Sequence, residues 1–218
     1  MILLENVTKT YVLNGRRKTV ADNITAVFPT GKAVALLGRN GAGKSSMLRM
    51  IAGNMLPTSG RILSTGSISY PVGFAGSFHP ELTGEQNCRF VARLYGVDTR
   101  DVQDFVKEFA ELGQHFFLPV RTYSSGMRAR LAFGVSMAIP FDTYLVDEVT
   151  SVGDQTFRKK SNEVFISRMT NASAIVVSHS FGMLREICHA AAVLENGKLT
   201  YFDDLEEALR QHLDNMGV

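Results

Sequence analysis

Two kinds of hydrophobic spacing alternate along this chain of 218 residues. Short apolar or alternating runs, typical of β-strands, occupy 2–12, 19–28, 32–37, 61–63, 67–70, 141–148, 172–177, 191–195 and 198–202. Apolar residues at helical spacing predict helices over 46–52, 83–95, 99–112, 154–169, 181–188 and 204–216, and one more beginning at Ser125. This alternation predicts an α/β fold on a parallel sheet, with a small antiparallel sheet at its N-terminal edge.

Turn and capping signals mark several element boundaries. A polar turn centred on Asn14-Gly15 is predicted for 13–18, and Asn196-Gly197 predicts a tight hairpin. Thr83 and Gln86 have the spacing of a capping box at the start of a helix.

The middle of the chain, 71–140, differs from its flanks. It begins with a loop punctuated by Gly and Pro and continues with predicted helices. It is therefore predicted to be a helical subdomain inserted in an α/β core that comprises 1–70 and 141–218.

The most informative stretch is a glycine-rich loop between a predicted strand and a predicted helix. It consists of Gly38, Arg39, Asn40, Gly41, Ala42, Gly43, Lys44, Ser45 and Ser46. A glycine, four free positions and then Gly-Lys-Ser is the spacing of a phosphate-binding loop. Glycines let successive backbone N–H groups turn toward an anion, and the following helix adds the positive end of its dipole. The Lys44 ammonium is predicted to reach the β- and γ-phosphates of a nucleoside triphosphate, and the Ser45 hydroxyl to bind Mg²⁺.

Two acidic residues, Asp147 and Glu148, end a predicted buried strand. Downstream of a phosphate loop, Asp147 fits the carboxylate that holds Mg²⁺, directly or through water. Glu148 is then expected near the γ-phosphate, where a carboxylate orients or deprotonates the attacking water. The alternative is that both acids merely cap the end of a strand.

His179 follows another apolar strand. Because the carboxyl ends of parallel strands gather at the nucleotide crevice, His179 is expected to hydrogen-bond the γ-phosphate or the water. The remaining histidines lack such placement and receive no role; they are His79, His115, His189 and His212.

The composition is that of an ordinary globular protein. Charged residues make up 20% and the net charge is +2, which lacks the basic excess of a nucleic-acid binder. Cys88 and Cys188 have no metal-ligand spacing and favour a reducing compartment over a disulfide framework. No apolar run approaches the roughly 20 residues that span a bilayer, and the N-terminus has no signal-peptide pattern. We therefore expect a cytosolic protein that reaches a membrane through a partner.

A serine- and glycine-rich turn, 123–127, precedes the helix that begins at Ser125. It is an anion site of the same physical type as the phosphate loop, although simple N-capping also explains it. The order of the phosphate loop, this turn, Asp147-Glu148, 151–154 and His179 resembles an ABC transporter nucleotide-binding domain over nearly the whole chain.

The resemblance implies a fold and further site residues. The fold is a P-loop NTPase core of the RecA-like type with an antiparallel β subdomain and an inserted helical subdomain. Tyr11 matches the aromatic residue that stacks on adenine, and Asp154 matches the loop acid that communicates between the two sites of a homodimer. Two copies are expected to enclose two ATP molecules with Mg²⁺. The phosphate loop of one copy then faces the signature turn of the other, which consists of Ser124, Ser125 and Gly126.

Longer stretches resemble the ATP-binding subunit of capsular polysaccharide exporters. They are 69–76, 82–84, 90–95, 122–128 and 130–134. This resemblance implies an ATPase that powers export through a separate permease, at the cytoplasmic face of a bacterial inner membrane. The segment 71–80, with Phe74 and Phe78 beside glycines, is the expected contact with that permease.

Two departures from the ABC pattern bear on the chemistry. Ser125 of the signature turn, and Met127 directly after it, stand at positions where the family usually has Gly and Gln. Most members also carry a glutamine after the strand at 67–70 that contacts Mg²⁺ and the attacking water. Here 72–74 is Val-Gly-Phe, and Gln86 lies too far along the chain. Hydrolysis is therefore expected to be slow, or tightly coupled to the partner.

Three alternatives stay open. The ATPase of an O-antigen or teichoic acid exporter resembles this chain in 71–80, but many of those carry an added C-terminal domain. A soluble ABC ATPase acting on nucleic acid or ribosomes usually joins two nucleotide domains or inserts long arms. An ATP-binding regulatory module without useful turnover would explain the missing glutamine.

Overall fold

The computed structural model describes residues 1–73, 78–147, 154–170 and 172–217. The chain divides into two compact units. The core unit comprises Met1–Pro71, Phe141–Glu148 and Met169–Val218, and the helical unit comprises Val72–Pro140 and Val149–Arg168. The helical unit thus includes most of the helix that follows Asp154, which the predicted subdomain of 71–140 did not contain.

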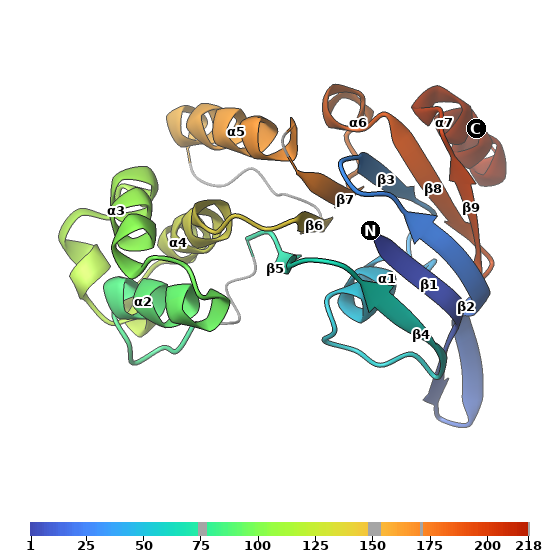
Figure 1. Ribbon diagram of the computed structural model, residues 1–218, viewed down its shortest axis with the longest axis horizontal. Helices are drawn as coiled ribbons and strands as arrows, with labels where there is room; N and C mark the ends of the chain where they lie inside the picture. Colours follow the sequence, from blue (N-terminus) through green and yellow to red (C-terminus); the bar gives the residue numbers. More distant parts are fainter. Residues whose placement is uncertain (74–77, 148–153, 171, 218) are drawn as a thin grey trace. The chain divides into compact units, whose positions relative to one another are not determined.

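An antiparallel sheet forms the N-terminal part of the core unit. Its strands are β1 (Ile2–Leu13), β2 (Arg16–Phe28) and β4 (Ser59–Ser64), in the order β2-β1-β4 (Figure 1). Asn14 and Gly15 turn the chain with φ angles of 49° and 75°, as a mirror-image two-residue hairpin turn requires. The turn predicted over 13–18 was too long, because 16–18 pair with β1 as part of β2.

The second sheet of the core unit is predominantly parallel. It contains β3 (Ala33–Leu37), β5 (Ile68–Pro71), β6 (Thr143–Asp147), β7 (Ser173–Val177), β8 (Ala190–Glu195) and β9 (Lys198–Phe202). The order is β5-β6-β7-β3-β8-β9, and β9 is antiparallel to β8. Every residue of β3 and β7 is buried, as expected for strands covered on both faces. Because β6, β7 and β3 are neighbours, their carboxyl ends lie together at one edge of the sheet.

Among the described residues, the helices that lie wholly in the core unit are α1 (Lys44–Ile51), α6 (Phe181–Ile187) and α7 (Leu205–Met216). The apolar face of α1 packs with residues of both sheets in one hydrophobic cluster. The predicted hairpin at Asn196-Gly197 is confirmed, with φ angles of 47° and 78°. The packing of α1 in this hydrophobic cluster holds the helix next to β3, the strand that precedes it in the chain.

The helical unit contains α2 (Gly84–Tyr95), α3 (Thr99–Ala110), α4 (Ser125–Ala138) and α5 (Gln155–Thr170) as far as Arg168. The short 3₁₀ helices η2 (Gly113–Phe117) and η3 (Val120–Thr122) were not predicted. The capping box is confirmed: Gln86 N–H donates to Thr83 Oγ1 at 3.1 Å, and Thr83 N–H donates to Gln86 Oε1 at 2.9 Å. Helix α3 ends before the predicted Leu112 because Glu111 adopts a left-handed φ of 53°.

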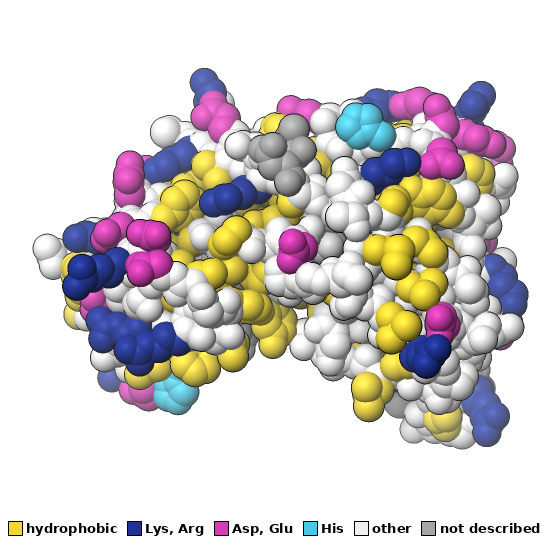
Figure 2. All heavy atoms as spheres, viewed as in Figure 1, with side chains coloured by type: hydrophobic (Ala, Val, Ile, Leu, Met, Phe, Trp, Pro, Cys, Tyr) yellow, Lys and Arg dark blue, Asp and Glu magenta, His cyan; other side chains and the backbone are white. Residues whose placement is uncertain are grey.

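Both cysteines are buried free thiols. Desolvation by burial raises the pKa of the Cys188 thiol to about 12 and raises that of Cys88 as well. Figure 2 shows acidic and basic side chains interspersed on the face that it presents. In the described ranges, none of the helices has both the length and the apolar composition to cross a membrane.

Candidate functional site

The glycine-rich loop runs from the end of β3 to the start of α1. At Gly43 φ is 111°, and a Cβ atom there would lie 2.7 Å from Val20 Cβ, so a larger residue is excluded. A Cβ on Gly38 would collide with the carbonyl oxygen of Leu194. Helix α1 then begins at Lys44 without a side-chain cap among the described residues, so its first backbone N–H groups face the loop unshielded by a capping side chain.

Lys44 and Ser45 are the first two residues of α1. The Lys44 ammonium donates to the carbonyl oxygens of Gly38 at 2.6 Å and Arg39 at 3.1 Å. The Ser45 hydroxyl lies 3.4 Å from Asp147 Oδ1. A hydroxyl and a carboxylate thus converge from α1 and β6, and such oxygen ligands fit Mg²⁺ when phosphate oxygens complete its coordination.

Side chains from β1 and β2 of the antiparallel sheet lie at or near the same loop. The Tyr11 hydroxyl lies 2.9 Å from Ser46 Oγ and 3.1 Å from Met55 Sδ, and the side chain is partly exposed. The Lys9 ammonium lies 5.4 Å from the centre of the Tyr11 ring. Stacking of this ring on adenine stays a prediction. Lys18, which sequence reasoning missed, brings its ammonium within 3.5 Å of where a Cβ on Gly41 would lie, and so adds positive charge beside the loop.

A pocket of about 380 Å³ opens beside the phosphate loop within the core unit. It is lined by 36–40, Lys44, Ser178, His179, Phe181, His212 and Met216. The structure therefore brings His179 to the same pocket as Lys44, Arg39 and Asn40, as expected from its place after a strand of the parallel sheet.

His212 and Met216 of α7 are pocket residues that sequence reasoning missed. The available signal was periodicity, since His212 continues the buried spacing of Leu205, Ala208 and Leu209 along α7. Burial lowers the pKa of His212, and the charges of Lys44 and His179 lower it further against the opposing effect of Glu195. These effects favour the uncharged imidazole.

The signature turn lies in the helical unit at the start of α4. Ser124 is the N-cap, and its Oγ accepts a hydrogen bond from Met127 N–H at 3.2 Å. Ser125 and Gly126 form the first turn of α4 and are exposed. The preceding Tyr123 is buried and donates to His115 O at 2.6 Å, and desolvation raises its pKa to about 12. Buried Tyr123 thus anchors a turn whose polar residues face outward.

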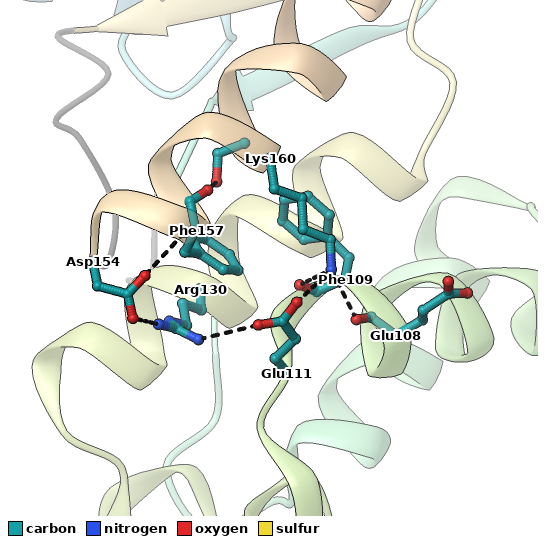
Figure 3. Close-up of polar contacts among 8 residues, drawn as sticks. Glu108, Phe109, Glu111, Arg130, Asp154, Phe157 and Lys160 are labelled. Atoms are coloured by element: carbon teal, nitrogen blue, oxygen red, sulfur yellow. Dashed lines mark hydrogen bonds and ion pairs between the residues drawn. The ribbon is translucent and has the colours of Figure 1, made fainter.

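Asp154 joins a network that links three helices of the helical unit (Figure 3). Its Oδ1 accepts from Phe157 N–H at 2.9 Å, which caps α5, and its Oδ2 lies 3.1 Å from Arg130 Nη2 on α4. The hydrogen bond from Phe157, followed in effect by Arg130, lowers the pKa of Asp154. Arg130 also pairs with Glu111 at 3.8 Å, and Glu111 binds Lys160 at 2.7 Å. The network ties the start of α5 to the signature helix α4 and to the end of α3.

Part of the predicted site lies outside the described residues. Glu148, the predicted catalytic base, is among the residues that the structure does not describe, as are 151–153 before Asp154. Residues 74–77 of the predicted permease contact also fall there, including Phe74.

Known proteins resemble the chain in sequence and in fold. The ABC transporter family model matches residues 21–151, more than half of the chain. The chain is 46% identical over 215 residues to the polysialic acid transport ATP-binding protein KpsT of Escherichia coli, covering 97% of this chain and 96% of that protein. It is 45% identical over 208 residues to the capsule polysaccharide export ATP-binding protein CtrD of Neisseria meningitidis serogroup B, covering 95% of this chain and 96% of that protein. The solved dimer of the ATP-binding cassette MJ0796 with ADP and Pi matches with a TM-score of 0.76 and 22% identity, covering 94% of this chain and 99% of that one. This last likeness shows the fold.

Proposed function

The chain belongs to the ABC transporter family, and on that premise we propose that it is the ATP-binding and ATP-hydrolysing subunit of a capsular polysaccharide exporter. The observation that carries this proposal is an identity of 45–46% over nearly the whole length to relatives named for polysialic acid transport and capsule polysaccharide export. The polymer crosses the inner membrane through a separate permease, and this subunit attaches to its cytoplasmic face through residues near 71–80.

ATP places its triphosphate in the loop 38–46, with Tyr11 against the base. Lys44 exchanges the carbonyl oxygens of Gly38 and Arg39 for phosphate oxygens, because the negative phosphates attract the ammonium more strongly. Ser45 and Asp147 would hold Mg²⁺, which would supply positive charge against the developing negative charge of phosphoryl transfer. His179 hydrogen-bonds the terminal phosphate or the attacking water from the edge of the pocket. Glu148 takes the proton of that water.

Two copies complete each site. Ser124, Ser125 and Gly126 of one copy contact the phosphates bound by the loop of the other, so ATP holds the homodimer together. Ser124 supports this role because its oxygen accepts the Met127 N–H while its own hydrogen remains available to a phosphate. Asp154 communicates between the two sites through its network with Arg130 and α5.

Phosphate release by the purified protein, alone and with its permease, tests the enzymatic part of the proposal. Glu148→Gln is expected to reduce turnover by about 100-fold or more, since it removes the general base, and to accumulate ATP-bound dimers in light scattering. Glu163→Gln, an exposed carboxylate on α5, is the matched control. Undiminished turnover in Glu148→Gln would remove Glu148 from this role.

The transported polymer is tested by purifying the subunit with its permease and identifying the bound glycan. A capsular polysaccharide supports the proposal, whereas an O-antigen or teichoic acid would move the chain to a neighbouring branch of exporters. Absence of phosphate release with the permease present would favour an ATP-binding regulatory module instead.

A further inference from the structure

Helix α7 forms one wall of the phosphate pocket. His212 and Met216 from its last two turns line the pocket together with Lys44 and His179. The C-terminal helix therefore reaches the place where the proposed function puts the terminal phosphate of ATP.

His212 is unusual for a buried residue. Its side chain is 7% exposed, and its Nδ1 has no hydrogen-bond partner among the described residues. Buried polar atoms are nearly always paired, because leaving one unpaired costs its full desolvation. Leucine at this position would fill similar space without that cost. A histidine that served only in packing would therefore lower the stability of the fold without any compensating interaction.

The turn that carries His179 is linked to α7. His179 lies directly before α6, which Ser180 caps by accepting Met183 N–H at 3.3 Å. Arg185 of α6 binds Glu206 of α7 through two contacts, Nε to Oε1 at 2.6 Å and Nη2 to Oε2 at 3.0 Å. Figure 1 shows α6 and α7 beside each other in the core unit. A bidentate ion pair therefore links α7, which carries His212, to the helix that follows the turn of His179.

We infer that His212 is a positioning residue of the ATPase site: its imidazole on α7, unpaired at Nδ1 within the described ranges, takes a hydrogen-bond partner when ATP fills the pocket and thereby orders the groups around Lys44 and His179 at the terminal-phosphate end. An uncharged imidazole can donate at one nitrogen and accept at the other, so it orders polar neighbours without adding charge to a cationic pocket. Helix α7 is thereby part of the site rather than a remote support. This inference rests on the proposed ATPase function.

Three substitutions separate positioning from packing. His212→Leu removes the polar atoms, His212→Asn restores a polar group near the Nδ1 position, and His212→Gln places one near Nε2 instead. Leu209→Met is the matched control, because Leu209 lies on the same buried face of α7 but outside the pocket. Steady-state kcat, KM for ATP and the melting temperature are measured for each.

His212→Leu is expected to lower kcat about five- to tenfold, the effect of one lost hydrogen bond, with KM little changed and the melting temperature equal or higher. His212→Asn is expected to recover most of kcat, and His212→Gln less. If His212→Leu keeps kcat within about twofold of the unmodified protein while the latter hydrolyses ATP, the role of His212 is overturned and the proposed function stands. If the unmodified protein neither binds nor hydrolyses ATP, the proposed function fails and this inference fails with it.

Discussion

Two helices of this protein begin at sites predicted to contact phosphate, and they begin differently. Helix α1 of the core unit follows Gly43 and has no side-chain cap among the described residues. Helix α4 of the helical unit follows Ser124, whose oxygen already accepts the Met127 N–H. The first site presents bare backbone amides to an anion, while the second presents a capped helix with a hydroxyl hydrogen to donate.

The basic side chains near these two helices, Lys44 and Arg130, also differ in what they bind. Lys44 donates to carbonyl oxygens of its own loop, which the proposed function exchanges for phosphate oxygens. Arg130 is held between the carboxylates of Asp154 and Glu111 and lies 4.3 Å from the centre of the Phe157 ring. In the proposed function, the core unit supplies the primary nucleotide site, and the signature turn of the helical unit supplies the complementary contact.

Lys44→Ala provides the largest test of this contrast. It removes the positive charge that stabilises the phosphates in both the bound state and the transition state, so ATPase activity should fall by about 100-fold or more. Phosphate release and binding of a fluorescent ATP analogue measure the effect, with Lys107→Ala on α3 as a control. Full activity in Lys44→Ala would discredit the assignment of the phosphate loop.

Substitution of Ser124 separates capping from nucleotide contact. Glycine is nearly as good an N-cap as serine, whereas alanine costs about 1 kcal/mol. If the hydroxyl contacts ATP, both Ser124→Gly and Ser124→Ala should lower ATPase activity about tenfold, the effect of one hydrogen bond to a charged group, although only Ser124→Ala loses thermal stability. Full activity in Ser124→Gly would show that the residue is only a cap.

The smallest expected effect concerns the stability of the fold in acid. It compares one hydrogen-bonded aspartate from each unit. Asp142 of the core unit accepts hydrogen bonds from Ser67 N–H at 2.7 Å and from the Ser67 hydroxyl at 2.8 Å, and these bonds lower its pKa. The hydrogen bond from Phe157 N–H lowers the pKa of Asp154 in the same way. Because the folded pKa values are lowered, the stabilisation is complete above about pH 5 and is lost as the pH falls through them.

Asp142→Asn and Asp154→Asn should each lower the melting temperature by roughly 2–4 °C at pH 7, a difference that shrinks toward zero in strong acid. The exposed Asp104→Asn on α3 is the control. A difference that does not change with pH would assign the effect to packing rather than to the charged carboxylate.

Short sequence patterns were enough to predict much of the fold and of the phosphate loop in the core unit. The phosphate loop, the capping box at Thr83 and the hairpin at Asn196 each depend on a few adjacent residues with a fixed geometry, so their spacing suffices to predict them. The resemblance to the ABC family and to its capsule-exporting members is confirmed by the identity to KpsT and CtrD.

Features that depend on tertiary contacts were not predictable from spacing. The pairing of 16–18 with β1 shortened the turn at Asn14, and the left-handed Glu111 ended α3 early. His212 received no role because the residues that line the pocket with it come from the phosphate loop and from the turn at His179, far away in the sequence. The same holds for Arg130, whose pairing with Asp154 spans two helices.

The sharing of one ATP by two copies is tested most directly by mixing two inactive variants. Lys44→Ala disables the phosphate loop, and Gly126→Asp places a negative charge where the phosphates of the other copy are expected. A Cβ at Gly126 meets only Ser124 Oγ at 3.9 Å, so the fold should tolerate this change. In a mixed dimer, the intact loop of one copy faces the intact turn of the other.

Equal mixing of Lys44→Ala and Gly126→Asp, after dissociation and reassembly, is predicted to recover about a quarter of the unmodified ATPase activity, because half the dimers then carry one intact site of two. Mixing Lys44→Ala with the double variant that carries both changes creates no intact site and should recover nothing. Activity that stays at the level of the separate variants in both mixtures would contradict a site built from two copies.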